Sequence, residues 1–283
     1  MALRGLASVL AIGACTAPAG PIIEAIPVTP VGHDAYLRWE ELPVIELGGR
    51  AYMRSTYDRS GGNAGADASH FLRQSEDGAS VTLDVAGTGV LVFARANHWH
   101  GSPWRWTIDG VDHVISETST ATPDQPVAGS TFLPADALPE PLAVTWSTTR
   151  GADLSWVPVP FTRSLTISYE RTHYGTGYYI YHLYPQADDQ RATVTAWNEE
   201  PPPTAVRELF GRAGTDIAPP GDEHEMTVDV AADGATAELA LAGPATVRKL
   251  SIDAPVALAA AVAQLRLVVS WDGAAPSIDA PLG

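Results

Sequence analysis

The stretch from Arg54 to Asn63 gathers side chains that could bind a sugar. Arg59 can donate two parallel hydrogen bonds from its planar guanidinium to a carboxylate or to a pair of neighbouring oxygens. Asp58 and Asn63 supply acceptors, and Tyr57 offers an aromatic face on which a sugar ring can stack. The turn sequence Gly-Gly just before Asn63 lets the backbone fold back and point these side chains at one place. The alternative is structural, with Asp58 and Arg59 only holding a loop.

A second group of chemically capable residues is His98-Trp99-His100. In a strand the two imidazoles share one face, a spacing that some metal sites of β-barrels use. No third ligand is evident, so we expect histidines that pack or face solvent, and no metal. Trp99 joins Tyr57 as a candidate for sugar stacking.

No catalytic pair is evident in the sequence. The adjacent acids Asp188-Asp189 and Glu199-Glu200 point to opposite sides of an extended chain, which makes them poor acid–base pairs. The chain has no phosphate-binding glycine-rich loop, no Gly-x-Ser-x-Gly turn and no candidate cysteine nucleophile. We therefore assign no catalytic residue and expect no cofactor.

Composition restricts the partners. The 283 residues include 33 acidic and 17 basic residues, which gives a net charge of −16, and Lys249 is the only lysine. Nucleic acids and anionic membrane surfaces bind clustered Lys and Arg, so we expect neither as a partner of the folded protein.

The N-terminus resembles a lipoprotein signal peptide. Arg4 precedes an apolar run, Gly5 to Ala14, that is too short to span a bilayer but has the length of a signal-peptide core. The run closes on a sequence similar to a bacterial lipobox, with the chain's single cysteine, Cys15, as the lipidated residue. We predict a signal peptide over residues 1–15, a tether over 16–35, and a lipid-anchored protein of the bacterial cell envelope.

Short apolar segments with a period of two, or with continuous apolar residues, recur between Gly and Pro turns and predict strands. They comprise Val81 to Val85, Val90 to Ala94, Trp104 to Ile108, Leu154 to Tyr169 and Tyr178 to Tyr184. Asp109-Gly110 predicts a hairpin turn, and Pro158 and Pro160 place their segment at a sheet edge or a bend.

Helical periodicity is rare: Thr204 to Arg212 is the best helix candidate, and Pro255 to Gln264 is ambiguous. The sequence therefore predicts an all-β chain with a jelly-roll sandwich. A hinge at Glu199 to Pro203 separates a first roll, residues 36–200, from the start of a second, residues 201–283.

Several blocks, in a shared order, resemble glycoside hydrolase family 172. Arg54 to Asn63 is similar to the family's Ser-Ser-Tyr-Asp-Arg-Thr-Gly-Gly-Asn block, and Trp106 to Gly110 to its strand ending in Asp-Gly. Trp156 to Ser164 resembles Pro-Met-Pro-Phe-x-Lys-Ser, and Tyr178-Tyr179-Ile180 resembles the Tyr-Tyr-Gln strand that follows it. Trp271 to Gly283 resembles Trp-Asp-Gly-x-x-Pro-Ser-Val-x-x-Pro-Leu-Gly. The resemblance covers about Leu42 to Gly283.

The resemblance implies a double jelly roll, usually homo-oligomeric, that hydrolyses or rearranges furanosides. Family activities concern difructose anhydrides, α-fructofuranosides and D-arabinofuranosides. The retaining mechanism uses two glutamates whose carboxyl groups lie about 5–5.5 Å apart.

This chain departs from the family at the catalytic blocks, Glu-Gly-Asp-Glu and Gly-Thr-Gly-Thr-Glu-Asp-Tyr. Gly175 to Tyr179 lacks the acid, and Gly221 to Glu225 lacks a partner block. Because the chain stops within the Trp271 to Gly283 motif, we expect a C-terminal truncation that leaves the second roll incomplete.

Two functions stay open. One is a furanoside hydrolase whose site is completed by further chain or by assembly. The other is a non-catalytic carbohydrate-binding or assembly protein. Its aromatic residues Tyr57, Trp99, Trp104 and Trp106 would hold a glycan without cleaving it.

Overall fold

The computed structural model divides into two compact units. Unit 1 comprises Met1–Ala25 and Ala218–Gly283, and unit 2 comprises Ile26–Ile217. The structure describes residues 9–15, 30–39, 49–56, 71–96, 103–118, 128–169, 177–184, 193–217, 221–227, 237–242, 247 and 249–282.

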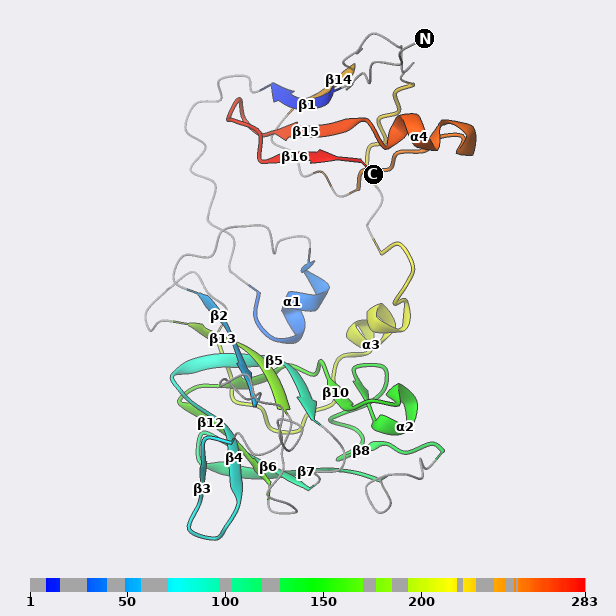
Figure 1. Ribbon diagram of the computed structural model, residues 1–283. Helices are drawn as coiled ribbons and strands as arrows, with labels where there is room; N and C mark the ends of the chain where they lie inside the picture. Colours follow the sequence, from blue (N-terminus) through cyan, green and yellow to red (C-terminus); the bar gives the residue numbers. More distant parts are fainter. Residues whose placement is uncertain are drawn as a thin grey trace. The chain divides into compact units, whose positions relative to one another are not determined.

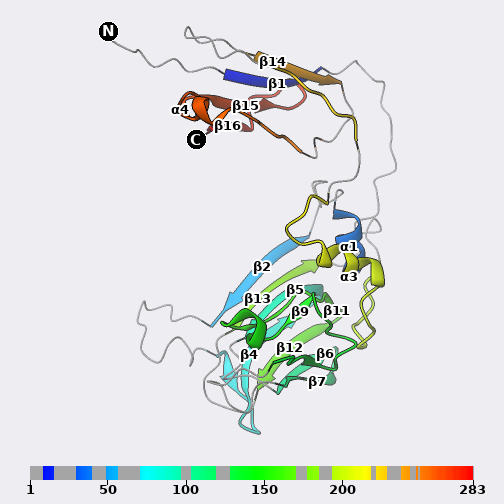
Figure 2. The ribbon, with the colours of Figure 1, turned by 90° about the vertical axis from the view of Figure 1, so that its right-hand side faces the viewer.

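Unit 2 contains two antiparallel sheets, which lie as two layers in Figure 2. The first sheet has the order β2-β13-β5-β10-β9, with β11 also paired to β5. Its strands are β2 (Arg50–Ser55), β5 (Thr88–Ala96), β9 (Ala143–Val144), β10 (Asp153–Ser155), β11 (Val159–Phe161) and β13 (Gly177–Tyr184). The described chain is mostly β, with antiparallel sheets in this unit, which confirms the predicted all-β class.

The second sheet has the order β3-β4-β12-β6-β7-β8. Its strands are β3 (Arg73–Gln74), β4 (Ser80–Ala86), β6 (Trp104–Ile108), β7 (Val111–Glu117), β8 (Phe132–Leu133) and β12 (Ser164–Tyr169). The strands predicted from the apolar segments are confirmed. So is the Asp109-Gly110 hairpin, whose residues take φ values of 54° and 91° between β6 and β7.

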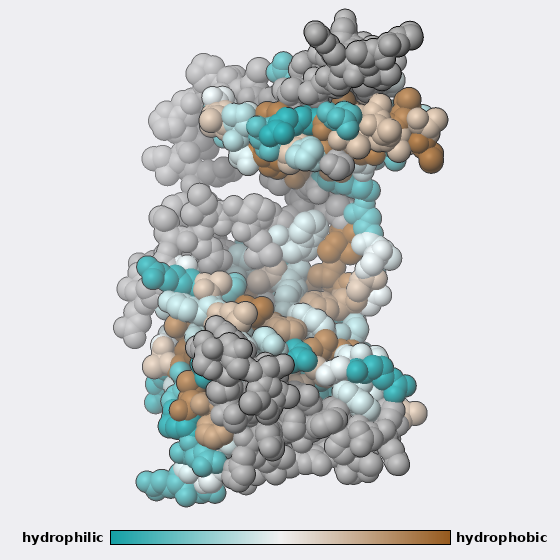
Figure 3. Space-filling model, viewed as in Figure 1, coloured by the Kyte–Doolittle hydropathy of each residue, from teal (hydrophilic) through white to brown (hydrophobic). Residues whose placement is uncertain are grey.

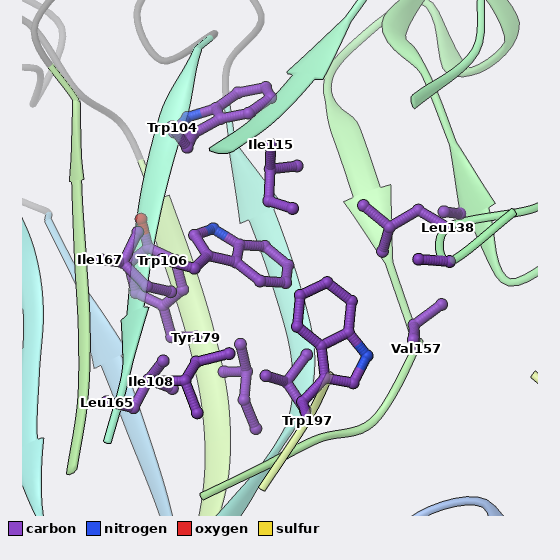
Figure 4. Close-up of a cluster of buried hydrophobic side chains, with 14 of the residues drawn as sticks. Trp104, Trp106, Ile108, Ile115, Leu138, Val157, Leu165, Ile167, Tyr179 and Trp197 are labelled. Atoms are coloured by element: carbon purple, nitrogen blue, oxygen red, sulfur yellow. The ribbon is translucent and has the colours of Figure 1, made fainter. Parts of the chain in front are cut away.

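Side chains from both sheets meet in one core, drawn in Figure 4. Period-two alternation turns Trp104, Trp106 and Ile108 of β6 toward it, with 4%, 5% and 1% of their surface exposed. The expectation that Trp104 and Trp106 hold a glycan is therefore wrong: both indoles are core residues and have no free face for a ligand.

The segment that contains Pro158 and Pro160 forms a bend between two short strands, as its prolines predict. β10 pairs with residues 94–96 of β5 and β11 with residues 89–91, so the two short strands follow one side of β5 in succession. The bend between them contains Pro158. Gly89 of β5 is required by close packing, since a Cβ there would lie 2.7 Å from Cζ of Phe161 and closer still to the carbonyl oxygen of His182.

The described part of unit 2 also contains the helices α1 (His33–Leu37), α2 (Trp146–Thr149) and α3 (Thr204–Gly211). α3 confirms the predicted helix. Tyr36 of α1 packs edge-on against Phe210 of α3, with ring centroids 4.9 Å apart, and its hydroxyl donates to the carbonyl oxygen of Trp156 at 2.7 Å. These contacts hold both helices together over the bend that contains Pro158.

The described residues of unit 1 form a four-stranded sheet of order β14-β1-β15-β16. The elements of this unit are β1 (Val9–Cys15), β14 (Ala237–Ala242), the 3₁₀ helix η2 (Val256–Leu258), α4 (Ala259–Val262), β15 (Arg266–Ser270) and β16 (Ile278–Pro281). The ambiguous segment Pro255 to Gln264 is thus helical in part. Among its described side chains only Val269 is buried, and hydrophobic atoms show at the surface around α4 in Figure 3. No helix in the described residues has the length and apolar character needed to cross a bilayer.

Candidate functional site at one end of the β-sandwich

The predicted sugar-binding residues Tyr57, Asp58, Arg59, Asn63 and Trp99 lie outside the described residues. The described strand ends that lead to them can be located. Ser55 of β2 pairs with Tyr178 of β13, which pairs with Arg95 of β5. Since neighbouring strands are roughly 4.8 Å apart, Ser55 and Arg95 are separated by about 10 Å. The chain therefore enters both predicted segments from one end of the same sheet.

Thr56, the residue before Tyr57, is fixed firmly at that end. It is fully buried, and its hydroxyl accepts a hydrogen bond from the Gly177 amide at 2.9 Å. Its own amide donates to the Gly177 carbonyl oxygen at 3.1 Å. The end of β2 is thereby tied to the start of β13.

A bulge in β4 places the hydroxyl and carbonyl groups of Thr82 inside the sandwich, close to β13 and β2. The β4–β12 register shifts at Thr82, whose hydroxyl lies 2.8 Å from the Tyr179 hydroxyl. The Nε of Arg54 donates to the Thr82 carbonyl oxygen at 3.5 Å. Burial raises the pKa of Tyr179 to about 12, so its hydroxyl keeps its proton. Arg54, the first residue of the predicted sugar-binding stretch, thus packs within the sandwich.

Asp153, the first residue of β10, is the most unusual acid in the described chain. It pairs in register with Ala96, the last residue of β5, and only 2% of it is exposed. One carboxyl oxygen, Oδ1, accepts from the Trp146 amide at 2.8 Å, whereas Oδ2 has no hydrogen-bond partner among the described residues. Burial, together with a smaller electrostatic effect of Glu117, raises the pKa of Asp153 to about 8 against the lowering effect of the Trp146 amide.

Glu117 ends β7 and is also buried, with 3% exposed. It pairs across the sheet with Phe132, two residues from Ser130. Ser130 contacts the hydroxyls of Thr145, at 2.5 Å, and of Ser147. Thr145 directly precedes the residue whose amide holds Asp153. Three hydroxyls, of Ser130, Thr145 and Ser147, thus contact one another, and the two buried acids lie at neighbouring backbone positions. We call this group the acid–hydroxyl cluster.

The acid–hydroxyl cluster combines a carboxyl group that is protonated at neutral pH with a second acid that acts on it electrostatically. A protonated carboxyl group can donate a proton to a leaving oxygen, and a neighbouring carboxylate can act as base or nucleophile. Sequence reasoning missed both residues. Each stands at a strand terminus, which the sequence shows, but their burial depends on the distant segments 130–132 and 145–147.

Asp109, in the hairpin turn after β6, has a structural role. The carboxylate of Asp109 accepts hydrogen bonds from the amides of Thr162, Arg163 and Ser164 at 2.6–3.1 Å and from the Thr162 hydroxyl at 2.6 Å. Partial burial acts to raise its pKa, but these hydrogen bonds outweigh burial and lower it. Asp109 lies at the other end of β6 from Trp104, so it fixes the turn between β11 and β12 rather than the candidate site.

The adjacent acids Glu199 and Glu200 bind different partners. Glu199 lies 2.7 Å from Nδ1 of His113, whose ring packs on Trp197 with centroids 5.1 Å apart. Glu200 accepts from the side-chain amide of Asn198 at 2.8 Å. They therefore do not act as one acid–base pair.

Cys15 is the last residue of β1, where it pairs with Ala242 of β14. Lipidation at Cys15 stays a prediction. Cleavage before this residue would remove Val9 to Ala14, which lie between β14 and β15 in the sheet.

Comparison of the sequence with protein-family models and with curated proteins finds no match to either.

Proposed function

We propose that this chain is a carbohydrate-binding β-sandwich protein of the glycoside hydrolase family 172 type, with furanoside glycans as ligands. The ordered sequence blocks from Leu42 to Gly283 support the family likeness, and the antiparallel two-sheet unit is compatible with a jelly roll. The proposal includes the jelly-roll topology, the homo-oligomeric state and the envelope location through a lipid on Cys15.

One observation carries the binding proposal. The sheet register places the end of β2, which precedes Tyr57 to Asn63, and the end of β5, which precedes Trp99, at the same end of the sheet. Ser55 and Arg95 in these two strand ends are about 10 Å apart. Binding residues are often found on loops that a rigid scaffold positions. The residue types of these two stretches, hydrogen-bonding side chains and aromatic rings, fit a sugar, which presents hydroxyls at its rim and C–H groups on its faces.

Calorimetric titration with oligosaccharides tests this proposal. We expect arabinofuranosyl or fructofuranosyl oligosaccharides to bind and glucopyranosyl oligosaccharides of equal length to bind far more weakly. Arg59→Ala should abolish furanoside binding while the unfolding transition stays unchanged, and Arg73→Ala, an exposed arginine paired with Asp84, serves as the matched control. Unchanged affinity in folded Arg59→Ala protein would remove Arg59 from the site.

A second candidate function is furanoside hydrolysis, which the family resemblance implies. A retaining hydrolase uses one carboxyl group as acid and another as nucleophile. Burial raises the pKa of Asp153 to about 8, which suits an acid, but both Asp153 and Glu117 are buried in the fold, so a substrate reaches them only if this end of the sandwich opens. Release of reducing sugar by the wild-type protein and its loss in Asp153→Asn, with binding retained, would support hydrolysis. Binding without release by the wild-type protein would leave the non-catalytic function.

A further inference from the structure

Strand β2 carries an aromatic and cationic face, of which the candidate site above uses only Arg54. Arg50, Tyr52 and Arg54 alternate along β2 and therefore share one face. Tyr52 pairs across the sheet with Tyr181, and the two rings stack with centroids 5.4 Å apart and planes 13° from parallel.

The stacked arrangement leaves one face of the Tyr52 ring available. β2 is the first strand of its sheet, with β13 on one side and no described strand on the other. Tyr181 therefore covers the ring face toward β13, and the opposite face points out of the sheet edge. The 39% exposure of Tyr52 agrees with this, since full coverage by packing would bury the ring.

The neighbouring arginine supplies polar contacts. The side chain of Arg50 is exposed and forms no hydrogen bond or ion pair within the described residues. It lies two residues from Tyr52 on the same face, at roughly 7 Å in an extended strand. A flat ring face beside a fork of N–H donors fits a sugar ring, whose C–H face stacks while its hydroxyl oxygens accept.

We propose that Tyr52 and Arg50 form an accessory subsite that binds one furanose ring of a longer oligosaccharide chain. The subsite lies on the strand that leads into the Tyr57 to Asn63 stretch, and Tyr52 is three residues, about 10 Å, from Ser55 at the strand end. This inference rests on the proposed function and narrows its ligand. The ligand is an oligosaccharide or polysaccharide that extends along β2, rather than a monosaccharide or disaccharide.

Titration with furanosyl oligosaccharides of increasing length tests the subsite. Wild-type affinity should increase with chain length, and Tyr52→Ala should lose this gain, about tenfold, or roughly 1.4 kcal/mol. Its affinity for the shortest ligands should stay at the wild-type value. Tyr52→Phe retains the ring and should bind long chains normally. Met53→Ala is the matched control, because Met53 is 64% exposed on the opposite face of the same strand.

Arg50→Ala provides a second test that removes no packed ring, and it should also weaken only the longer ligands. The subsite is refuted if folded Tyr52→Ala or Arg50→Ala binds long chains like the wild type, or loses short and long ligands equally. If Arg59→Ala abolishes binding while both β2 variants bind normally, the accessory subsite is wrong and the proposed function stands. If the wild-type protein binds no furanoside of any length, both proposals fall.

Discussion

The pH dependence of stability tests whether the carboxyl group of Asp153 is buried and protonated in the folded protein. This carboxyl group is buried, holds one hydrogen bond from the Trp146 amide and has a pKa raised to about 8. In the unfolded chain an aspartate has a pKa of about 3.9. Between these two values the folded protein binds one proton more than the unfolded chain at this site.

The sign and size of the effect follow from this difference. Stability from this site is greatest below the unfolded pKa and falls as pH rises toward about 8, by about 1.4 kcal/mol per pH unit. From pH 5 to pH 7 the loss is about 3 kcal/mol. Asp153→Asn retains the acceptor oxygen for Trp146 but does not titrate, so this loss is absent in the variant.

Urea unfolding of both proteins at pH 5, 6 and 7 measures the effect. The free energy of unfolding of the wild type, minus that of Asp153→Asn, should decrease by about 3 kcal/mol across this range. Asp84→Asn is the control, because Asp84 is an exposed acid in an ion pair with Arg73. A difference that stays constant with pH would show that Asp153 is ionised in the folded protein and would refute the account of the acid–hydroxyl cluster.

Three further predictions concern the fold and the N-terminus. Asp109→Asn should lower the free energy of unfolding by about 1–3 kcal/mol at pH 7, because amide hydrogen bonds lose a charged acceptor. Since the folded pKa of Asp109 is lowered, its contribution should disappear as pH falls below about 3.9 and through that lower pKa; an equal deficit in acid would contradict it. Gly89→Ala should cost about 1–3 kcal/mol in thermal unfolding, whereas Gly151→Ala, with no atom within 4 Å of the added Cβ, should be tolerated. The N-terminal peptide of the protein from its native cells should begin at Cys15 and carry acyl chains, and a peptide that retains residues 1–14 would contradict lipidation at Cys15.

The strands could be predicted because the alternation of apolar and polar residues is a local feature of the sequence. The same alternation indicates that Trp104 and Trp106 are core residues and do not bind a glycan. Ile108 shares their face, whereas Arg105 and Thr107 occupy the other face and both donate to Asp112 there. A face that contains only apolar residues is the core face, so alternation alone assigns these indoles to the interior.

The acid–hydroxyl cluster could not be predicted in the same way. Asp153 and Glu117 are 36 positions apart, and their burial depends on how β8, α2 and β10 meet in the folded chain. The same holds for the Tyr52–Tyr181 pair, whose register is set by a sheet that joins distant segments. Local patterns therefore identify strands and turns, but not which side chains become neighbours across them.

The crystal structure of the protein with a furanosyl oligosaccharide, at ligand concentrations above the measured dissociation constant, tests the central proposal most directly. We predict sugar density at the end of the sandwich that carries Thr56 and Ala96, with a further ring against Tyr52. Sugar bound at another face of the molecule, or no binding of any furanoside at such concentrations, would contradict the account.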